Sequence, residues 1–299
     1  MPASPFAKEV LIRCFPELSG FDYIGAGTFK TVYRVTLADG QEEVLKIIRI
    51  PMDQSSDEAK QIHDQELGRA KRETRLLEAN ESPFIVKVGS LAPTQRDLEG
   101  AECLAYTEEL LPGRDLSSTI KDYVLAKVQP DAGDVKELLK CLVLAVQSLA
   151  KQSAVHRDIK PANVFDTGLE QRPFVLLDLG IAFDTTEPGL TANKLEIPMT
   201  PLYVAPEMFN PDFRENISPR SDLYSAALTV FEYAAGRHPL EKSGDDLRRT
   251  ITRVMNQEPL RLEGLRPDLP KPLTNLINQF LKKKPSLRPS NFEQILKIL

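Results

Sequence analysis

The chain has 299 residues, of which 41% are hydrophobic and 27% charged, with a net charge of −5 at neutral pH. This composition predicts a soluble globular protein with enough chain to bury a core, in one large or two small domains. The negative net charge gives no basic footprint of the kind that nucleic-acid-binding proteins carry. The sequence contains no run of about 18 apolar residues, so no membrane span is predicted. Three widely spaced cysteines and the lack of a signal peptide indicate the cytoplasm.

A short helix and a hairpin are the first elements expected. An amphipathic run over residues 5–15, stopped by Pro16 and Gly20, predicts the helix. Residues 21–35 alternate apolar and polar positions on both sides of a small-residue turn at 25–28, which predicts a β-hairpin. Glycines at such a tip let backbone N–H groups approach a phosphate, although a plain hairpin turn is the commoner reason for them.

A lysine lies inside the next predicted strand, residues 42–50. Lys46, in V-L-K-I-I, would lose hydration there without compensation unless an anion is paired with it. Helical spacing over residues 56–80 places Glu73 on one face with Arg69 and Leu77, and Glu73 is the partner that we expect for Lys46. Glu66, one or two turns earlier, is the alternative.

Two strands, near residues 86–91 and 103–107, are expected before a Pro112–Gly113 turn, where we place the boundary between two lobes. A strongly apolar helix follows over residues 134–153, with Asp134 as its predicted N-cap. This helix delivers the chain to the most informative stretch of the sequence.

Residues 154–165 read A-V-H-R-D-I-K-P-A-N-V-F and group three polar side chains in one loop. Asp158 can accept or orient a hydroxyl proton, Lys160 can neutralise a phosphate oxygen, and Asn163 can hold a metal ion through its amide oxygen. The following apolar strand, F-V-L-L-D-L-G, ends in Asp178, whose carboxylate needs a cation such as Mg²⁺.

The rest of the chain is predicted to be mainly helical. A Thr- and Pro-rich span, 178–207, closes with T-P-L-Y-V-A-P-E, and an apolar helix over 221–235 is ended by Gly236. Further helices are expected near residues 245–255, 273–283 and 291–299.

H-R-D-I-K-P-A-N resembles the catalytic loop of eukaryotic-type (Hanks-type) serine/threonine protein kinases. The glycine loop, strand lysine, helix glutamate, D-L-G and A-P-E occur in that family's order over residues 20–299. The resemblance implies an α+β, bilobal protein-kinase-like fold: a helical extension (1–20), a small antiparallel β N-lobe with a regulatory helix (21–110) and a larger, mainly helical C-lobe (111–299). The compact domain and its unusual loops look bacterial or effector-like.

The same resemblance implies ATP and Mg²⁺ as cofactors, with Mn²⁺ as a substitute. The implied catalytic residues are Asp158, Lys160, Lys46, Glu73 and Thr200, and the implied metal ligands are Asn163 and Asp178. The implied nucleotide-binding residues are Ile24, Gly25, Ala26, Gly27, Val32, Val44, Lys46, Glu109, Leu111 and Phe165. The residue at the back of the adenine site is either Glu108 or, after a one-residue shift, Thr107.

Supporting contacts are implied as well. Glu207 of A-P-E should pair with Arg288, Asp222 should brace the backbone of the catalytic loop, and Thr200 should lie against Asp158. Arg157 indicates control by a phosphate on the activation segment, for which Thr185, Thr186 and Thr191 are candidates and Thr191 is favoured.

We therefore expect a serine/threonine kinase of protein substrates that autophosphorylates, through a transient homodimer. A nucleotide-binding pseudokinase scaffold and a small-molecule kinase of related fold are the alternatives. The loop G-A-G-T-F-K-T-V-Y-R also resembles that of the with-no-lysine kinases, in which a lysine at the position of Lys30 replaces the strand lysine. Both lysines are present here, and we expect Lys46 to hold the phosphates while Lys30 points to solvent.

Overall fold

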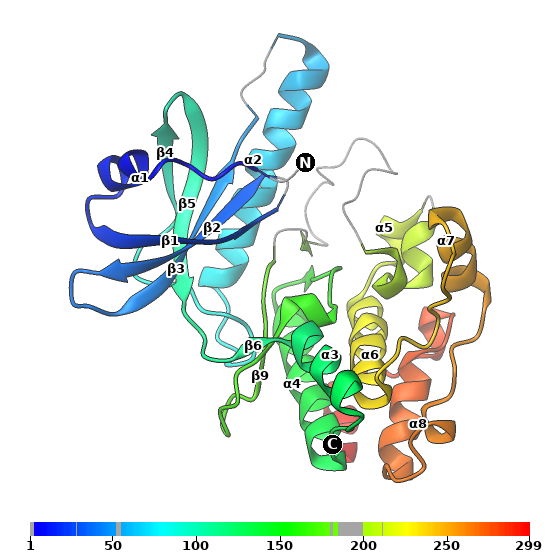
Figure 1. Ribbon diagram of the computed structural model, residues 1–299. Coiled ribbons are helices and arrows are strands. Elements are labelled where there is room, and N and C mark those ends of the chain that lie inside the picture. Colours follow the sequence, from blue (N-terminus) through cyan, green and yellow to red (C-terminus); the bar gives the residue numbers. More distant parts are fainter. Residues whose placement is uncertain (1–2, 28, 52–54, 180–181, 185–199, 211) are drawn as a thin grey trace. The chain divides into compact units, whose positions relative to one another are not determined.

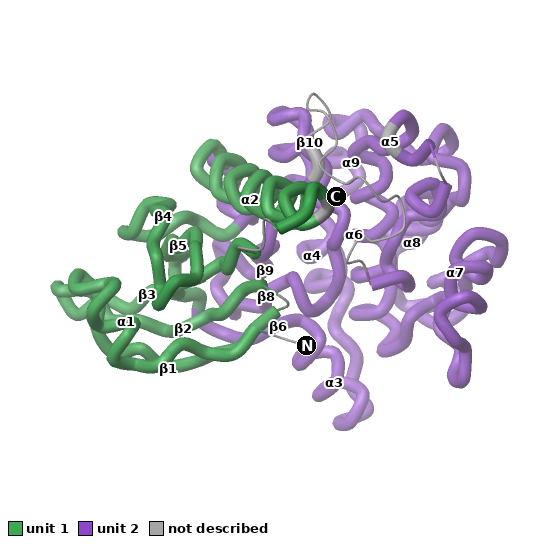
Figure 2. The backbone as a smooth tube through the Cα atoms, turned by 90° about the horizontal axis from the view of Figure 1, so that it is seen from above, with its two compact units in different colours: residues 1–80, 86–111 green, residues 81–85, 112–299 purple. Residues whose placement is uncertain are grey.

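The computed structural model describes residues 3–27, 29–51, 55–179, 182–184, 200–210 and 212–299. The chain divides into two compact units (Figure 2), here named the sheet unit, residues 1–80 and 86–111, and the helical unit, residues 81–85 and 112–299. In the described part of the chain, the first unit holds a five-stranded antiparallel sheet with two helices, and helices dominate the second (Figure 1), which confirms the predicted α+β, bilobal fold.

The sheet unit has the strand order β1-β2-β3-β5-β4. Its strands are β1 (Leu18–Ala26), β2 (Lys30–Leu37), β3 (Glu42–Arg49), β4 (Thr94–Leu98) and β5 (Ala101–Glu109). Alternate side chains of a strand point to opposite faces, so each face has its own chemistry. One face contributes Tyr33, Leu45 and Ile47 to an apolar core that also buries Val10 and Leu11 of α1 (Lys8–Cys14).

The opposite face of the sheet carries the lysine that the sequence singled out. Lys46 pairs in register with Val32 on β2 and with Tyr106 on β5, so these three residues share that face. Helix α2 (Asp57–Glu78) packs on this side, where its Glu73 accepts a hydrogen bond from the Tyr106 hydroxyl. The hydroxyl of Ser56 caps the first turn of α2 by accepting from the Ala59 N–H at 3.1 Å.

The strand expected over residues 86–91 is wrong, because this segment makes only an isolated bridge, between Val88 and Glu108, and β4 lies further on. Gly89 and Leu91 bond to the backbone of Thr107, and the Thr107 hydroxyl accepts from the Leu91 N–H at 2.9 Å. A side chain thus replaces part of the backbone ladder, which local sequence does not reveal.

The described residues of the helical unit form two small sheets, β6-β8-β9 and β7-β10. Their strands are β6 (Arg114–Asp115), β7 (Ala154–Val155), β8 (Val164–Asp166), β9 (Phe174–Leu176) and β10 (Phe183–Asp184). The α-helices are α3 (Leu116–Ala126), α4 (Ala132–Lys151), α5 (Phe213–Asn216), α6 (Pro219–Ala235), α7 (Leu247–Asn256), α8 (Lys271–Phe280) and α9 (Phe292–Ile298). Short 3₁₀ turns are η1 (Pro161–Asn163), η2 (Pro201–Tyr203), η3 (Pro206–Phe209), η4 (Leu262–Gly264) and η5 (Pro285–Leu287).

Two helix ends in this unit can be compared with their predictions, the C-terminus of α6 and the N-cap of α4. Gly236, at φ +68°, ends α6 in the left-handed conformation, as predicted. The predicted N-cap of α4 is wrong, because the cap is Asp131, whose Oδ1 accepts from the Asp134 N–H at 2.9 Å. Asp134 is instead an acidic residue of the first turn, where the helix dipole also favours it. Among the described residues, no helix has both the length and the apolar character needed to cross a bilayer.

Candidate active site

Two lysines and two glutamates of the sheet unit form a buried cluster. Lys30, at the start of β2, places its Nζ 2.8 Å from Oε1 of Glu73 on α2. Lys46, on β3, places its Nζ 2.6 Å from Oε1 of Glu108 on β5. Three of these side chains are less than 10% exposed, whereas that of Lys30 is 17% exposed. The charges balance in number, as burial requires.

Tyr106 links the two ion pairs. Its ring is fully buried, and its hydroxyl donates to Glu73 Oε1 at 2.8 Å and lies 3.4 Å from Glu108 Oε1. Burial raises the pKa of Glu108, while the charges of Lys46 and Lys30 oppose that rise. Glu108 therefore depends on its cation to stay ionised.

The expected pairing of Lys46 with Glu73 is wrong in this structure, and so is the expectation that Lys30 points to solvent. Glu66 is not the partner either, because it pairs with Arg69 one turn along α2. A glutamate inside the apolar strand L-A-Y-T-E-E was the signal for the observed pair, since a buried carboxylate also needs a cation.

The same geometry distinguishes the surroundings of the two residues considered for the back of the adenine site. Glu108 shares a face of the sheet with Lys46, whereas the Thr107 hydroxyl is engaged by the Leu91 N–H. Val32 and Val44, both half-buried, lie on the Lys46 face as well.

The other predicted nucleotide-binding residues of the sheet unit differ in what they can offer. The Glu109 N–H donates to the Lys87 carbonyl at 3.0 Å, and its side chain accepts from the Lys87 N–H at 2.9 Å, so Glu109 is tied to the segment before β4. Leu111, half-buried, is the last residue of the unit, and Ile24 is 55% exposed on β1. Ala26 ends β1 and pairs with Thr31 across the hairpin.

Nothing in the described part of the structure requires glycine at positions 25 and 27 of the hairpin tip. A Cβ built on either meets no described atom within 4 Å, and neither has a positive φ. The protein's own packing and backbone therefore leave both positions open, and they remain suited to close approach by a ligand.

Three predicted residues of the helical unit, Lys160, Asn163 and Thr200, gather around Asp158. Lys160 Nζ lies 2.7 Å from Asp158 Oδ2 and 2.9 Å from the Thr200 hydroxyl, so Thr200 reaches the aspartate through the lysine. Asn163 Nδ2 donates to the Asp158 carbonyl at 2.9 Å and to its Oδ2 at 2.8 Å. Both donors use Oδ2, so these two hydrogen bonds do not engage Oδ1.

The backbone of this loop is held by Asp222 of α6, as predicted. Its two carboxylate oxygens accept from the His156 and Arg157 N–H groups at 2.7 and 2.9 Å. Arg157 has φ +73°, a conformation that costs a non-glycine residue about 1 kcal/mol or more. Asp222 thus fixes a strained turn that immediately precedes Asp158. Burial raises the pKa of Asp222, and the positive charge and backbone donors around it oppose the shift.

A second predicted contact, between Glu207 and Arg288, is also confirmed. The guanidinium donates to both carboxylate oxygens at 2.7 and 2.8 Å, and the Ser221 hydroxyl donates to Glu207 at 2.7 Å. Both charged side chains are almost fully buried, in the bidentate geometry that makes such pairs strong. This pair ties the segment after Thr200 to the end of the helical unit.

The chemistry of Asn163 and Asp178 fits a divalent metal ion. Both side chains are half-buried and offer oxygen, and Asn163 donates its amide hydrogens to Asp158, which leaves its amide oxygen as the donor atom. Among the described residues, no group of three or more His, Cys, Asp or Glu side chains could hold a metal alone. Mg²⁺ suits such a sparse set because it retains water and binds substrate phosphates.

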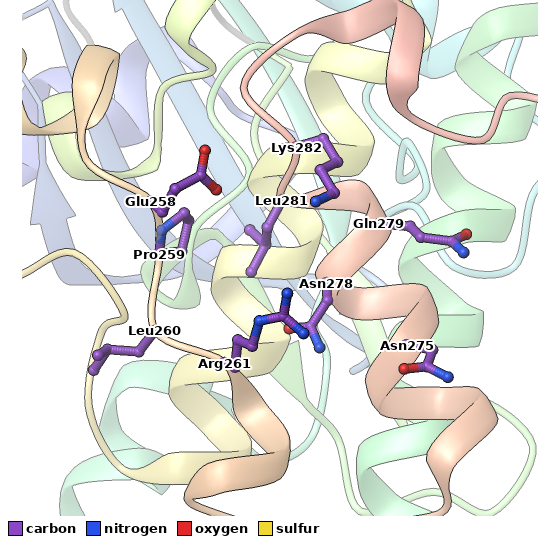
Figure 3. Close-up of a pocket in the computed structure, with 9 residues that line it drawn as sticks. All are labelled: Glu258, Pro259, Leu260, Arg261, Asn275, Asn278, Gln279, Leu281 and Lys282. Atoms are coloured by element: carbon purple, nitrogen blue, oxygen red, sulfur yellow. The ribbon is translucent and has the colours of Figure 1, made fainter.

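The remaining predicted residues divide into those outside the described part of the chain and one inside it. Thr28, Gly180 and the three threonines considered for phosphorylation lie outside the described residues. Phe165, predicted to contact adenine, is half-buried on β8. A pocket elsewhere in the helical unit (Figure 3) involves none of the predicted site residues and is lined by Glu258, Pro259, Leu260, Arg261, Asn275, Asn278, Gln279, Leu281 and Lys282.

Comparison with known proteins places this geometry in a family context. Residues 19–298 match the protein kinase domain family. The chain is 34% identical over 221 residues to the serine/threonine-protein kinase PkaA of Streptomyces coelicolor, covering 73% of this chain and 37% of that protein. It is 28% identical over 284 residues to the serine/threonine-protein kinase Nek11 of Homo sapiens, covering 92% of this chain and 39% of that protein. The serine/threonine-protein kinase pkn2 of Myxococcus xanthus is 29% identical over 236 residues, which cover 76% of this chain and 26% of that protein. The chain thus spans well under half the length of these relatives.

Proposed function

The chain belongs to the protein kinase domain family, and from this premise we infer that it transfers the γ-phosphoryl group of ATP to serine or threonine hydroxyls of a protein substrate. The arrangement of Asp158, Lys160 and Thr200 carries this proposal. Phosphoryl transfer requires positioned charge rather than a covalent protein intermediate, and these residues supply it within one loop.

Each residue of the loop has a distinct proposed role. Asp158 orients the attacking hydroxyl through Oδ1 and takes its proton as the new oxygen–phosphorus bond forms and the bond from the γ-phosphorus to the bridging oxygen of ADP breaks, with ADP as the leaving group. Lys160, held between Asp158 and Thr200, stabilises the charge that develops on the transferred phosphoryl group. Asn163 keeps Asp158 in place with its amide hydrogens and offers its amide oxygen to a metal ion, together with Asp178. The family generally uses Mg²⁺, which neutralises phosphate charge when bound.

The geometry of the sheet unit leads us to revise which lysine binds the phosphates. Lys30 has the helix partner, Glu73, that was expected for Lys46, and it retains more exposure to a ligand. Lys46 is neutralised by Glu108. We therefore assign the phosphate contact to Lys30, with the backbone of Gly25 and Gly27, and a counter-ion role to Lys46.

Regulation and setting complete the proposal. We propose autophosphorylation on the activation segment at Thr185, Thr186 or Thr191, in a transient homodimer, which mass spectrometry of the active protein tests. Burial raises the pKa of the free thiols of Cys103 and Cys141 to about 12, so both thiols stay protonated. Unpaired buried thiols fit a reducing compartment, and we therefore place the protein in the cytoplasm.

The central test is transfer of labelled phosphate from ATP, with Mg²⁺, to a generic basic protein, followed by identification of the modified amino acid. Asp158→Asn should leave ATP binding within about twofold of wild type and lower the transfer rate about 100-fold or more. Asp122→Asn, an exposed charge on α3, is the matched control and should leave both values unchanged. ATP binding without transfer by the wild-type protein would favour the scaffold instead.

A further inference from the structure

Residues 3–7 lie before the part of the chain that matches the kinase family, yet they contact the hairpin proposed to bind phosphate. The Ala3 N–H donates to the Gly27 carbonyl at 2.8 Å. The Phe6 N–H donates to the Tyr33 hydroxyl at 2.7 Å. Figure 1 shows this segment in dark blue, running along the sheet before α1. We name residues 3–7 the strap.

Arg49 joins the strap to the hairpin from a second side. Its guanidinium lies over the Phe6 ring, 3.9 Å from the centroid, and donates to the Ser4 carbonyl. Its own backbone N–H donates to the Phe29 carbonyl at 2.7 Å. Two carbonyls of the hairpin tip, those of Gly27 and Phe29, are therefore held, and Lys30 follows directly.

The strap has a firm anchor and a weak hold on the hairpin. Val10 and Leu11 of α1 are at most 3% exposed and belong to the core of the sheet unit. The strap itself is half-buried at Ala3 and Phe6 and exposed at Ser4 and Pro5. A segment with few buried contacts opens at low free energy, while its anchor stays folded.

We propose that the strap positions the hairpin tip, and with it Lys30, for the nucleotide phosphates. A glycine-containing tip loses much backbone freedom when it closes on a ligand. If the strap already orders the tip in the folded protein, less backbone entropy is lost when ATP binds, and the KM for ATP is lower. Phe6 and Tyr33 are positioning residues in this scheme. The proposal rests on the proposed function, because it takes the hairpin as the phosphate-binding loop.

The decisive variants are Phe6→Ala and Tyr33→Phe. The first removes the ring beneath Arg49, and the second removes only the hydroxyl that accepts from the Phe6 N–H. Each should speed hydrogen exchange of the amides of residues 24–32 and raise the KM for ATP about fivefold, with kcat changed less than twofold. A strap with a merely structural role would lower thermal stability without this split between KM and kcat.

Controls separate the strap from general loosening of the unit. Phe6→Tyr keeps an aromatic face under the guanidinium and should retain the wild-type KM for ATP. Phe6→Leu lacks that face and should raise the KM as Phe6→Ala does. Tyr23→Phe changes an exposed tyrosine that packs edge-on against Tyr33, with ring centroids 5.8 Å apart, and should leave both exchange and KM unchanged.

The two measurements distinguish failure of this proposal from failure of the proposed function. Unchanged exchange of residues 24–32 in Phe6→Ala would overturn the strap, whatever the enzyme's activity. Faster exchange with an unchanged KM for ATP in an active enzyme would also overturn it. A wild-type protein that transfers no phosphate, while Phe6→Ala still accelerates exchange, would refute the proposed function and leave the structural part of the strap intact.

Discussion

Replacing Lys46 by methionine tests whether this lysine is a counter-ion or a ligand of the nucleotide. The change removes the cation 2.6 Å from Glu108 and leaves that carboxylate, only 4% exposed, without a charged partner of its own. Breaking a buried ion pair costs about 3–5 kcal/mol. Because burial already raises the pKa of Glu108, the carboxyl can escape part of this cost by taking up a proton, and we expect about 3 kcal/mol.

The double variant Lys46→Met/Glu108→Leu supplies the comparison. It removes both charges and fills the space with apolar atoms, and the Tyr106 hydroxyl keeps its bond to Glu73. Replacing a whole buried ion pair by apolar residues is often neutral, so we expect stability within about 1 kcal/mol of wild type. Urea unfolding of the wild type, both single variants and the double variant gives the coupling energy, expected to be about 2 kcal/mol or more.

A pH series checks the electrostatic reasoning in the same experiment. In Lys46→Met the folded-state pKa of Glu108 lies above its unfolded value, so the folded state binds the extra proton. The stability of this variant relative to wild type should therefore be greatest below about pH 4.5, the ordinary pKa of a glutamate, and fall as the pH rises through the folded-state pKa of Glu108. The double variant lacks the titrating group and should show no such added dependence.

Kinetics complete the test of the lysine assignment. If Lys46 only neutralises Glu108, the double variant should recover kcat to within about tenfold of wild type, whereas Lys30→Met should lose about 100-fold or more. Recovered stability without recovered activity in the double variant, together with an active Lys30→Met, would refute our assignment. It would return the phosphate contact to Lys46.

Three further predictions follow from single features. Gly113→Ala should destabilise the protein by about 2 kcal/mol or more, because φ is +96° and the new Cβ would lie 2.0 Å from the Asp166 carbonyl oxygen. Gly168→Ala is the control: its φ is +69° and no described atom lies within 4 Å of the new Cβ, so the unfolding free energy should fall by only about 1 kcal/mol. Thermal unfolding of both variants measures the difference. Arg288→Lys keeps the charge but loses the bidentate fork to Glu207, and should lower the unfolding free energy by about 2 kcal/mol or more. Hydrogen bonds to Asp64 and Glu102 raise the pKa of His63 above its usual 6.5, so its contribution is full below about pH 6.5 and is lost as pH rises through the folded pKa; unfolding at pH 6 and 8 should show this difference, and His63→Gln should abolish it.

The sequence by itself determined the fold class and most of the helical-unit site. Asp158, Lys160 and Asn163 lie within six residues, so the loop that joins them also brings them together. The long helices followed from apolar periodicity, and Gly236 marked the end of α6 because its left-handed conformation favours glycine. Family-like spacing extended this to the distant pair of Glu207 and Arg288.

Only the tertiary structure decided which charges meet in the sheet unit. Lys46 and Glu108 are 62 residues apart, and Lys30 and Glu73 are 43 apart, so strand register and the packing of α2 select the partners. Sequence pattern shows that a buried lysine needs an anion, but it cannot rank glutamates on separate elements when each could satisfy that need. The strap lay beyond prediction for a related reason. One of its contacts joins two backbone groups, and the others join it to the side chains of Tyr33 and Arg49 on two separate strands, so strand register decides whether they meet.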